Sequence, residues 1–514
     1  MKKEIKPFKS IKMKNKILLF VAAMLLSVAS GLAQSGTCGD SLIWAFNSET
    51  GTLTINGKGK MWNFSDVPWE PHLPWESYLS QIVQVSIDDG VTSIGNIAFQ
   101  DCINLTSVNS SNSIVSIGQY AFYNCINLAS FNFSNSIVSI EGYAFYNCSK
   151  LTSVSFYDNV KNIGFRTFGN CTSLTSVDIP NCVEYIEVEA FADCTALTSV
   201  TIGNNVTYIG YAAFRNTLWL NNQPDGLVYM GKVLYVYKGT MPENTAIEVQ
   251  DGTISITGEA FGYQTGLISI TIPNSVTNIG YSTFKSCTSL TSIHIPEGVT
   301  KIGGGAFSNC TALISVNIPE GVTTIGGTFS NCTALTSVNI PESVTTIGGG
   351  TFYNCTALTS ITIPQNVTSI SYEAFAECTS LLSITSLNLI PPGFMEGWFI
   401  TYDVFNGVDK TSCVLRVPAS SVSWYKRAFV WKDFYQIVAI GATAIEETAI
   451  PAIHIYPNPT TGKVYTETES AVKVYNLQGI LLQETFGNQV DLSAYPQGEY
   501  LLRVEDRAVK VIKN

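Results

Sequence analysis

Apolar residues recur along most of this chain with a period of 23 residues, broken once by a step of 22. In each period an isoleucine stands four or five residues before a phenylalanine, and in most of them a cysteine follows three residues later. The phenylalanines are Phe99, Phe122, Phe145, Phe168, Phe191, Phe214, Phe261, Phe284, Phe307, Phe329, Phe352 and Phe375. The cysteines of this pattern are Cys102, Cys125, Cys148, Cys171, Cys194, Cys287, Cys310, Cys332, Cys355 and Cys378. A repeat of this length predicts a solenoid in which each unit forms one coil.

The unit after Cys355 shows what each coil contains. Leu358 is followed by Ile361 and Ile363, whose alternation predicts a short strand with both isoleucines pointing inward. Pro364 ends this strand because it lacks the next backbone donor. Ala374 and Phe375 are predicted to open a tight helical turn that leads to Cys378. No single coil can bury its apolar residues alone, so stacked coils are expected to share one continuous core.

The repeat consensus resembles that of BspA-like leucine-rich-repeat surface proteins of bacteria. The motif is Cys-Thr-x-Leu-Thr-Ser-Val-x-Ile-Pro-x-x-Val-Thr-x-Ile-Gly-x-x-Ala-Phe-x-Asn, and about twelve copies cover residues 82–385. The resemblance implies a repeat solenoid of short β-strands and tight helical turns. It also implies a surface adhesin that binds host matrix proteins and other cells.

Residues 1–33 have the features of a secretory signal peptide. Seven lysines precede an apolar run, Ile17 to Ala29, that is too short to span a bilayer. Small residues then predict cleavage between Ala33 and Gln34. No later apolar stretch reaches the length of a membrane span, so the mature chain is expected to have no transmembrane helix.

The flanks of the repeat predict caps that cover its open ends. Residues 34–81 form the N-terminal cap, and an alternative for its aromatic loop is a sugar-binding patch that exposes Trp62, Trp69 and Trp75 on one face. Residues 386–440 form the C-terminal cap.

Between Phe214 and Phe261 the repeat is interrupted. Alternating residues around Gly231-Lys232 predict a hairpin insertion, residues 218–245, that projects from the solenoid. It is either a binding protrusion or a structural spacer.

After a linker, residues 441–452, the period disappears. Short alternating runs separated by turn signals predict a small all-β sandwich over residues 453–514. This tail resembles the type IX secretion C-terminal sorting domain. The residues that carry the likeness include Tyr456, Pro457, Asn458, Pro459, Gly498 and Tyr500. The resemblance implies the type IX machinery as a partner and an exported location, at the outer cell surface or outside the cell.

The net charge and the types of side chain present exclude several kinds of partner and site. The formal net charge is −11, and removing the lysine-rich leader makes it more negative, which disfavours nucleic acid and anionic membrane surfaces as partners. The repeating cysteines point in parallel directions, which favours buried free thiols over disulfides. No Cys-x-x-Cys occurs, and His72, His294 and His454 are scattered, so no metal, cofactor or catalytic site is expected.

The outward-facing position of the first strand is the candidate ligand face. It is held by Asn109, Asn132, Ser155, Asp178, Thr201, Thr271, His294, Asn317, Asn339 and Thr362. These short polar side chains favour a non-enzymatic binding protein, an adhesin for host or partner-cell proteins or glycans. The alternatives are a glycan-capture module for nutrient uptake and a sheet face that is merely solvated.

Overall fold

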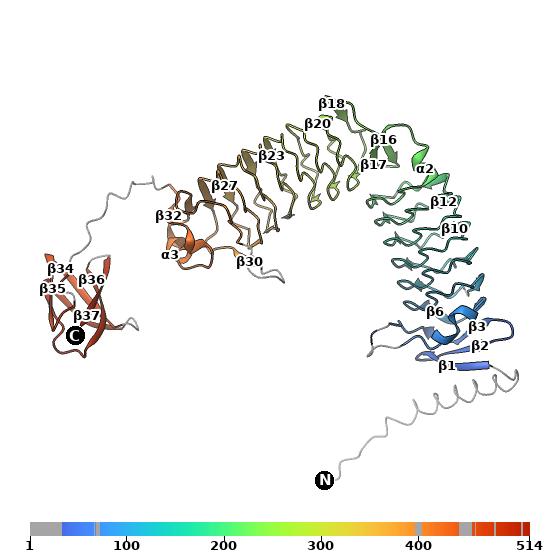
Figure 1. Cartoon of the computed structure of the whole chain (residues 1–514), viewed down its shortest axis with the longest axis horizontal. Coiled ribbons are helices and arrows are strands. Elements are labelled where there is room, and N and C mark those ends of the chain that lie inside the picture. Colours follow the sequence, from blue (N-terminus) through green and yellow to red (C-terminus); the bar gives the residue numbers. More distant parts are fainter. Residues whose placement is uncertain are drawn as a thin grey trace, which may run out of the picture. The chain divides into compact units, whose positions relative to one another are not determined.

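The computed structural model describes residues 33–65, 67, 72–110, 112–395, 403–441, 455–457, 459–476, 480–504 and 507–514. Residues 1–32 of the predicted signal peptide, Trp69 and Asn458 lie outside these ranges. The chain divides into two compact units, Met1–Ile440 and Gly441–Asn514. The first unit is the predicted solenoid, and Figure 1 shows its coils stacked in chain order.

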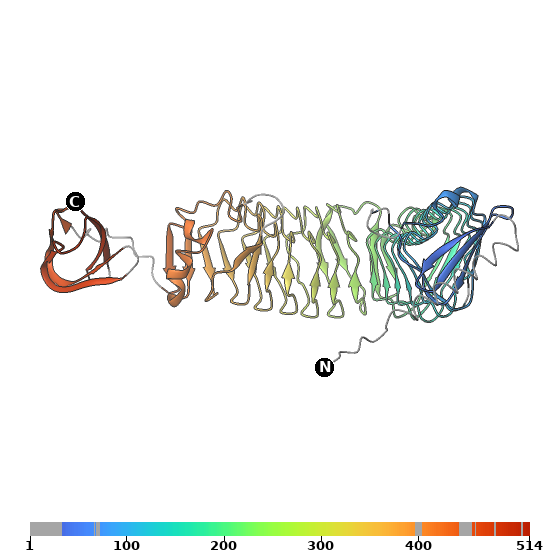
Figure 2. The same cartoon turned by 90° about the horizontal axis from the view of Figure 1, so that it is seen from below.

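Most coils contribute one strand to a front row of parallel strands, which carries the Ser-Val-x-Ile segments. Figure 2 shows strands of successive coils side by side. Equivalent residues lie directly opposite one another, as Ser176 opposite Ser199 and Ile179 opposite Ile202. The front row contains β3 (Thr52–Gly57), β5 (Gln84–Ile87), β7 (Ser107–Asn109), β10 (Ser153–Ser155), β12 (Ser176–Ile179), β14 (Ser199–Ile202), β18 (Thr245–Glu248), β20 (Leu267–Thr271), β23 (Ser315–Asn317), β25 (Ser337–Asn339), β27 (Ser360–Ile363), β29 (Ser383–Ser386), β31 (Val414–Val417) and β32 (Gln436–Ala439).

A back row of shorter strands, centred on the isoleucine of each repeat, runs along another side of the stack. Ile163 pairs with Ile140 and with Ile186 in unbroken register. The back row contains β4 (Gly59–Lys60), β6 (Val91–Ile94), β8 (Ser116–Ile117), β9 (Ser139–Ile140), β11 (Asn162–Ile163), β13 (Tyr185–Ile186), β15 (Tyr208–Ile209), β16 (Gly226–Met230), β17 (Val233–Lys238), β19 (Ser255–Ile256), β21 (Asn278–Ile279), β22 (Lys301–Ile302), β24 (Thr324–Ile325), β26 (Thr346–Ile347), β28 (Ser369–Ser371) and β30 (Gly393–Met395).

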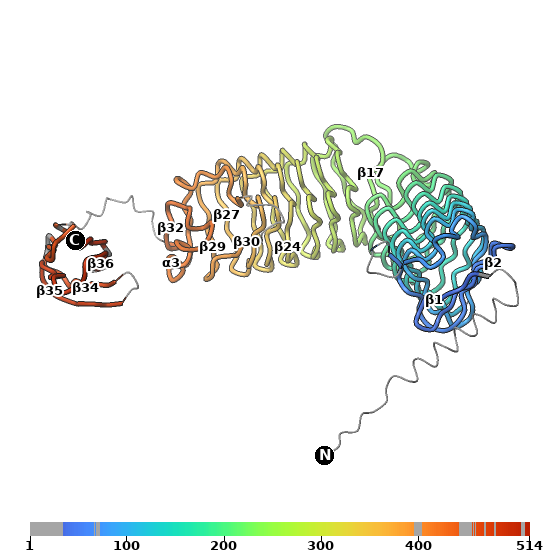
Figure 3. The backbone as a smooth tube through the Cα atoms, turned by 60° about the horizontal axis from the view of Figure 1, so that its bottom comes forward, coloured from blue at the N-terminus to red at the C-terminus, as the bar shows by residue number. Residues whose placement is uncertain are grey.

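Tight turns close each coil, and their backbone explains the recurring asparagine. The turn at Phe122 is held by the Cys125 N–H donating to the Phe122 carbonyl, and the Phe122 N–H donates to Ala144 of the next coil. Asn124 and Asn147 have φ near +60°, a conformation that asparagine tolerates well. The Asn147 amide donates to Asn124 Oδ1 at 2.6 Å, so the side chains continue the ladder between coils. The tube in Figure 3 shows this coil-by-coil rise.

The phenylalanines form two columns of stacked rings inside the coils. Neighbouring centroids lie 5.3 Å apart between Phe261 and Phe284 and 5.4 Å apart between Phe145 and Phe168, with both pairs of planes within 8° of parallel. Stacking of this kind adds to the stability gained by burial.

Both flanks add strands to the same rows and end the ring columns with tryptophan. At the N-terminal end, β1 (Ala33–Gly39) and β2 (Leu42–Asn47) pair antiparallel, and β3 pairs in parallel with β5. Trp75 is fully buried and stacks on Phe99, while its indole N–H donates to the Ala98 carbonyl at 2.8 Å. At the other end Trp431 packs against Phe405. The short helices of these flanks are η1 (Glu76–Gln81), η2 (Ala419–Ser421), α3 (Val422–Tyr425) and η3 (Trp431–Asp433).

The predicted hairpin is present but is built into the stack. It follows α2 (Leu218–Asn221), and β16 and β17 pair antiparallel around the turn at Gly231. β17 then pairs in parallel with β19, and Val233, Leu234 and Tyr235 are buried. The prediction of a projecting insertion is therefore wrong. Figure 1 places β16, β17 and β18 between the two runs of coils.

The expected continuous core is also corrected at this hairpin. The buried residues fall into two clusters, one reaching Tyr235 and the other beginning at Leu234. Adjacent side chains of β17 therefore face different cores. The Tyr235 hydroxyl accepts a hydrogen bond from the Phe214 N–H at 2.9 Å, in place of the backbone carbonyl that the next coil offers to equivalent residues such as Phe191.

The second unit is all-β, as predicted. Its strands are β33 (Ile455–Tyr456), β34 (Lys463–Tyr475), β35 (Leu481–Asp491), β36 (Gly498–Val504) and β37 (Arg507–Lys513). Among the described residues, all five join one antiparallel sheet. Val464, Val474 and Leu502 are fully buried in its separate core.

Candidate functional site

The structure exposes every member of the predicted ligand face. All ten residues, from Asn109 to Thr362, are exposed. The reason is the alternation of the front strands, which buries Val177 and Ile179 and turns Asp178 outward. Parallel pairing without register shift places Asp178 opposite both Ser155 and Thr201. The result is a column of polar side chains about 4.8 Å apart along the stack.

Some of these side chains bond to one another. The Asn339 amide donates to Asn317 Oδ1 at 2.7 Å, and the Thr201 hydroxyl donates to Asp178 Oδ1. Such bonds hold the side chains in defined positions, so a ligand would meet a prearranged surface.

The column is not one uninterrupted sheet. No front strand forms at Asn132, where Phe131 and Phe133 occupy the inward positions and pack against Phe145. Around His294 only an isolated bridge links Ser292 to Ser315. The bulk of the two phenylalanines accounts for the first break.

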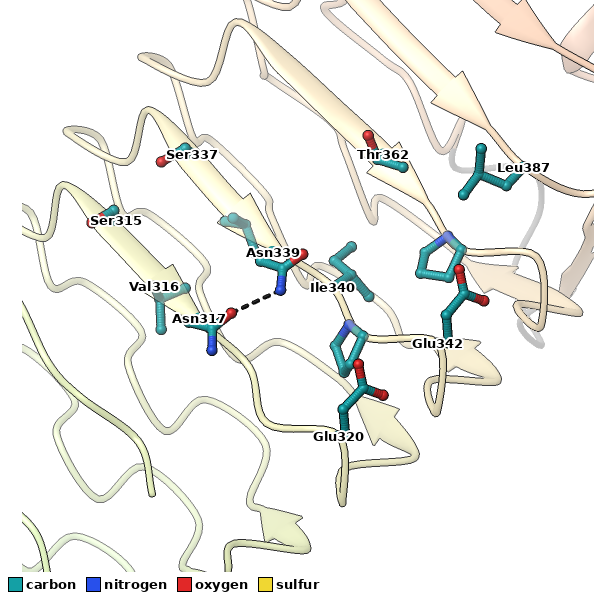
Figure 4. Close-up of a pocket in the computed structure, with 13 residues that line it drawn as sticks. Ser315, Val316, Asn317, Glu320, Ser337, Asn339, Ile340, Glu342, Thr362 and Leu387 are labelled. Atoms are coloured by element: carbon teal, nitrogen blue, oxygen red, sulfur yellow. Dashed lines mark hydrogen bonds between the residues drawn. The ribbon is translucent and has the colours of Figure 1, made fainter. Parts of the chain in front are cut away.

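One part of this face is hollowed, and Figure 4 shows its lining. The hollow has a volume of about 570 Å³ and lies over β23, β25 and β27. Asn317, Asn339 and Thr362 contribute to it, together with the carboxylates of Glu320 and Glu342 and the apolar side chain of Leu387. No lysine or arginine is among the lining residues. Hydrogen-bonding groups and two acids therefore converge on one concave patch of the predicted ligand face.

The cysteines serve packing. All thirteen are free thiols, and for the ten of the repeat this agrees with the prediction from their parallel register. Nine of the ten thiols of the column, all except Cys102, donate to a phenylalanine carbonyl of the preceding coil, for example Cys287 Sγ to Phe261 O at 3.1 Å. Burial raises the pKa of Cys287 and of Cys378 to about 12, so these thiols stay protonated and unreactive at neutral pH. Cys182 lies outside the column and is only half-buried.

The aromatic N-terminal cap does not offer the predicted sugar-binding patch. That prediction required Trp62, Trp69 and Trp75 to be exposed on one face. Trp75 is fully buried, and Trp62 is half-buried against the core. The prediction is wrong because Trp75 stacks on Phe99 at the end of the phenylalanine column and its indole N–H donates to the Ala98 carbonyl.

The residues of the sorting motif occupy the second unit. Tyr456 lies in β33, opposite Tyr465. Tyr500 is buried in β36, and its hydroxyl donates to the Pro496 carbonyl at 2.7 Å. Gly498 begins the same strand with φ +155°, and Pro457 and Pro459 flank the undescribed Asn458. At the other end of the chain, Ala33 and Gln34 of the predicted cleavage site begin β1.

An ion-pair network on the turn side of the coils was not predicted from the sequence. Glu189 is nearly buried and binds both Arg166, at 2.8 Å, and Arg215, at 3.2 Å. Arg215 also pairs with Asp193 at 2.9 Å. These residues come from successive coils at turn positions. Over the described residues no group of three potential ligands could hold a metal ion, and no helix is long and apolar enough to span a membrane.

Comparisons with known proteins agree with this architecture. Residues 77–160, 115–224, 235–328 and 315–391 match the family described as BspA type Leucine rich repeat region, in six copies. Residues 454–514 match the secretion system C-terminal sorting domain. No curated protein matches the chain.

Three solved structures are similar in fold. A leucine-rich repeat protein from Eubacterium ventriosum is 24% identical, with 67% of this chain and 95% of that chain covered and a TM-score of 0.39. A leucine rich cell surface protein from Faecalibacterium prausnitzii is 26% identical, with 71% and 96% covered and a TM-score of 0.34. A leucine-rich repeat protein from Bacteroides ovatus is 21% identical, with 68% and 93% covered and a TM-score of 0.31.

The two family matches cover both units of the chain. The sorting domain directs its carrier out of the cell, and the repeats form the solenoid described above. The chain therefore belongs to the BspA-type leucine-rich-repeat family, carries a C-terminal type IX secretion sorting domain, and is exported to the cell surface or the extracellular space.

Proposed function

We propose that this protein is a non-enzymatic adhesin that binds host or partner-cell macromolecules through the front row of its solenoid. The observation that carries the proposal is the exposed polar column, which continues along the front row on both sides of the hairpin. It is concave where Asn317, Asn339, Glu320 and Glu342 meet.

The side chains of this column favour recognition over catalysis. They are mainly amides and hydroxyls, which donate and accept hydrogen bonds but are weak proton-transfer groups at neutral pH. Many such groups at a fixed spacing can hold an extended surface through weak contacts that add together. The two carboxylates of the hollow favour a partner that is basic where it meets them.

The test is a binding screen of the full exported chain against extracellular matrix proteins and intact host cells. The informative variant is Asn317→Ala with Asn339→Ala, and its matched control is Thr346→Ala, a polar position on the back row. A partner that binds the wild type and the control but loses affinity for the double variant supports the proposal. Absence of any partner, or equal binding by all three proteins, contradicts it.

A further inference from the structure

A second hollow lies on the back row of the first run of coils, away from the front-row strands. It follows β6, β8, β9 and β11 and has a volume of about 680 Å³. Small residues leave room for it, with Ser116 and Ser139 in register on adjacent strands. Gly118 and Gly164 line the hollow without side chains. A Cβ at these two positions would come within 2.5 Å of Asn96 and 2.9 Å of Glu141 in the preceding coil, so glycine is required there. The stacking of the coils therefore creates a lengthwise trough in this region.

The sides of this trough carry polar groups that the protein itself does not use. They are the amides of Gln119 and Asn162 and the carboxyls of Glu141 and Glu187. Within the described part of the chain, none of these four side chains makes a hydrogen bond or an ion pair. Glu187 is half-buried, and this burial raises the pKa of its carboxyl. Planar amide and carboxyl groups of this kind can bond two neighbouring hydroxyls of a ligand at once.

Aromatic rings lie at one end of the trough. Phe165 is 39% exposed and is held in place by the edge of Tyr143 at 5.2 Å and by the Arg166 guanidinium at 5.3 Å. The column that contains Asn162 continues in register to Tyr185 and Tyr208. Tyr185 is 46% exposed, and its ring centroid lies 6.3 Å from that of Tyr208. A polar trough thus passes directly into a short aromatic surface.

We propose that this trough and the adjoining rings bind an extended, uncharged, β-linked polysaccharide. Glu141 and Glu187 occupy the same repeat position two coils apart. With successive coils about 4.8 Å apart, their backbones are separated by roughly 10 Å, which is close to the length of two sugar units in such a polymer. Amides and carboxyls suit the hydroxyls of each sugar, and exposed rings suit its apolar face.

Two other ligand classes fit less well. An extended peptide would need a free strand edge, but β8, β9, β11 and β13 are each paired on both sides. An anionic polymer would meet the carboxylates of Glu141 and Glu187, while Arg166 beside Phe165 is already paired with Glu189 and Lys60 is the one cation among the described lining residues. The formal net charge of −11 also disfavours such a polymer.

The experiment measures binding of the full exported chain to soluble neutral hexasaccharides, β-linked polymers of glucose and of N-acetylglucosamine, by isothermal titration calorimetry. Heparin serves as the anionic comparison. Phe165→Ala and Tyr185→Ala are each expected to lower the affinity about tenfold. Ser139→Lys is expected to abolish binding by filling the trough, and its fold is protected because Lys301 occupies the same repeat position.

The control is the front-row double variant of Asn317 and Asn339, which leaves this trough intact and should bind sugar normally. Each variant is first shown to melt like the wild type. The inference is overturned if no neutral hexasaccharide binds, if the three variants bind as the wild type does, or if heparin binds more tightly. Because the adhesin proposal depends on the front row, either proposal can fail without the other.

Discussion

Replacing Phe307 by alanine should remove a central link of the second phenylalanine column. Phe307 is fully buried, with its ring centroid 5.3 Å from that of Phe284 and 5.5 Å from that of Phe329. A buried Phe→Ala change costs about 3–5 kcal/mol, and each stacked pair accounts for about 0.5–1.5 kcal/mol beyond burial. Since Phe307 loses two such pairs, we expect a cost near 5 kcal/mol.

Phe261 provides the matched comparison. It is equally buried but stacks on Phe284 alone, because its other neighbour, Tyr237, is 6.3 Å away and tilted by 34°. Phe261→Ala should therefore cost about 1 kcal/mol less than Phe307→Ala. Chemical denaturation followed by circular dichroism measures both changes.

Hydrogen exchange locates the effect of Phe307→Ala. Coils interact mainly with their neighbours, and the buried core is divided at β17. The rate of amide hydrogen exchange should therefore rise in the coils around Phe307, while the amides of residues 91–214 should exchange as they do in the wild type. A cost below about 2 kcal/mol, or an equal rise of exchange in both runs of coils, would refute the reasoning about stacked rings and separate cores.

Three further predictions concern the thiols and the turns. In the native protein, Ellman's reagent should react quickly with Cys182 alone, because the other twelve cysteines are buried and burial also keeps the thiols of the column protonated. Reaction of all thiols should need denaturant. Rapid reaction of several thiols in the native protein would contradict this. Gly350→Ala should lower the free energy of unfolding by about 1–2 kcal/mol because φ there is +60°. Ala212→Gly, at the equivalent turn position with φ +55°, should leave the free energy of unfolding unchanged or raise it. A decrease for both variants would count against the explanation. Asn147→Gly keeps the backbone conformation but removes two amide bonds between coils, so it should cost about 1–3 kcal/mol, and Asn147→Ala should cost more, as thermal unfolding would show.

Much of the fold could be predicted from the repeat because its apolar positions report directly on burial. Phe307, Cys310 and Ile302 recur at fixed offsets, and the structure buries each of them. Exposure of the front column followed for the same reason, since alternation along a strand decides which side chains point outward. The hairpin at Gly231 was also predictable as a pair of strands, from its turn and its alternating residues.

The errors arose where contacts come from other coils. No local pattern showed that β17 would join the back row, because that depends on the register between Leu234 and Ile256. The alternative of an exposed Trp75 was wrong because Trp75 stacks on Phe99, a residue of the next coil. The back-row trough was missed as well, although two successive tyrosines, Tyr185 and Tyr208, replace the usual serine or asparagine there.

The coil, its period and the inward or outward direction of most side chains could therefore be predicted from the amino-acid sequence alone. These properties depend on short-range alternation and on a repeat that copies the same environment many times. Which outward-facing residues contact one another depends on how the coils stack, because neighbours in adjacent coils are about 23 residues apart in the chain. Three features exist only in the stacked coils: the carboxylates around Asn339, the two cores that meet at Leu234 and Tyr235, and the trough that ends at Phe165.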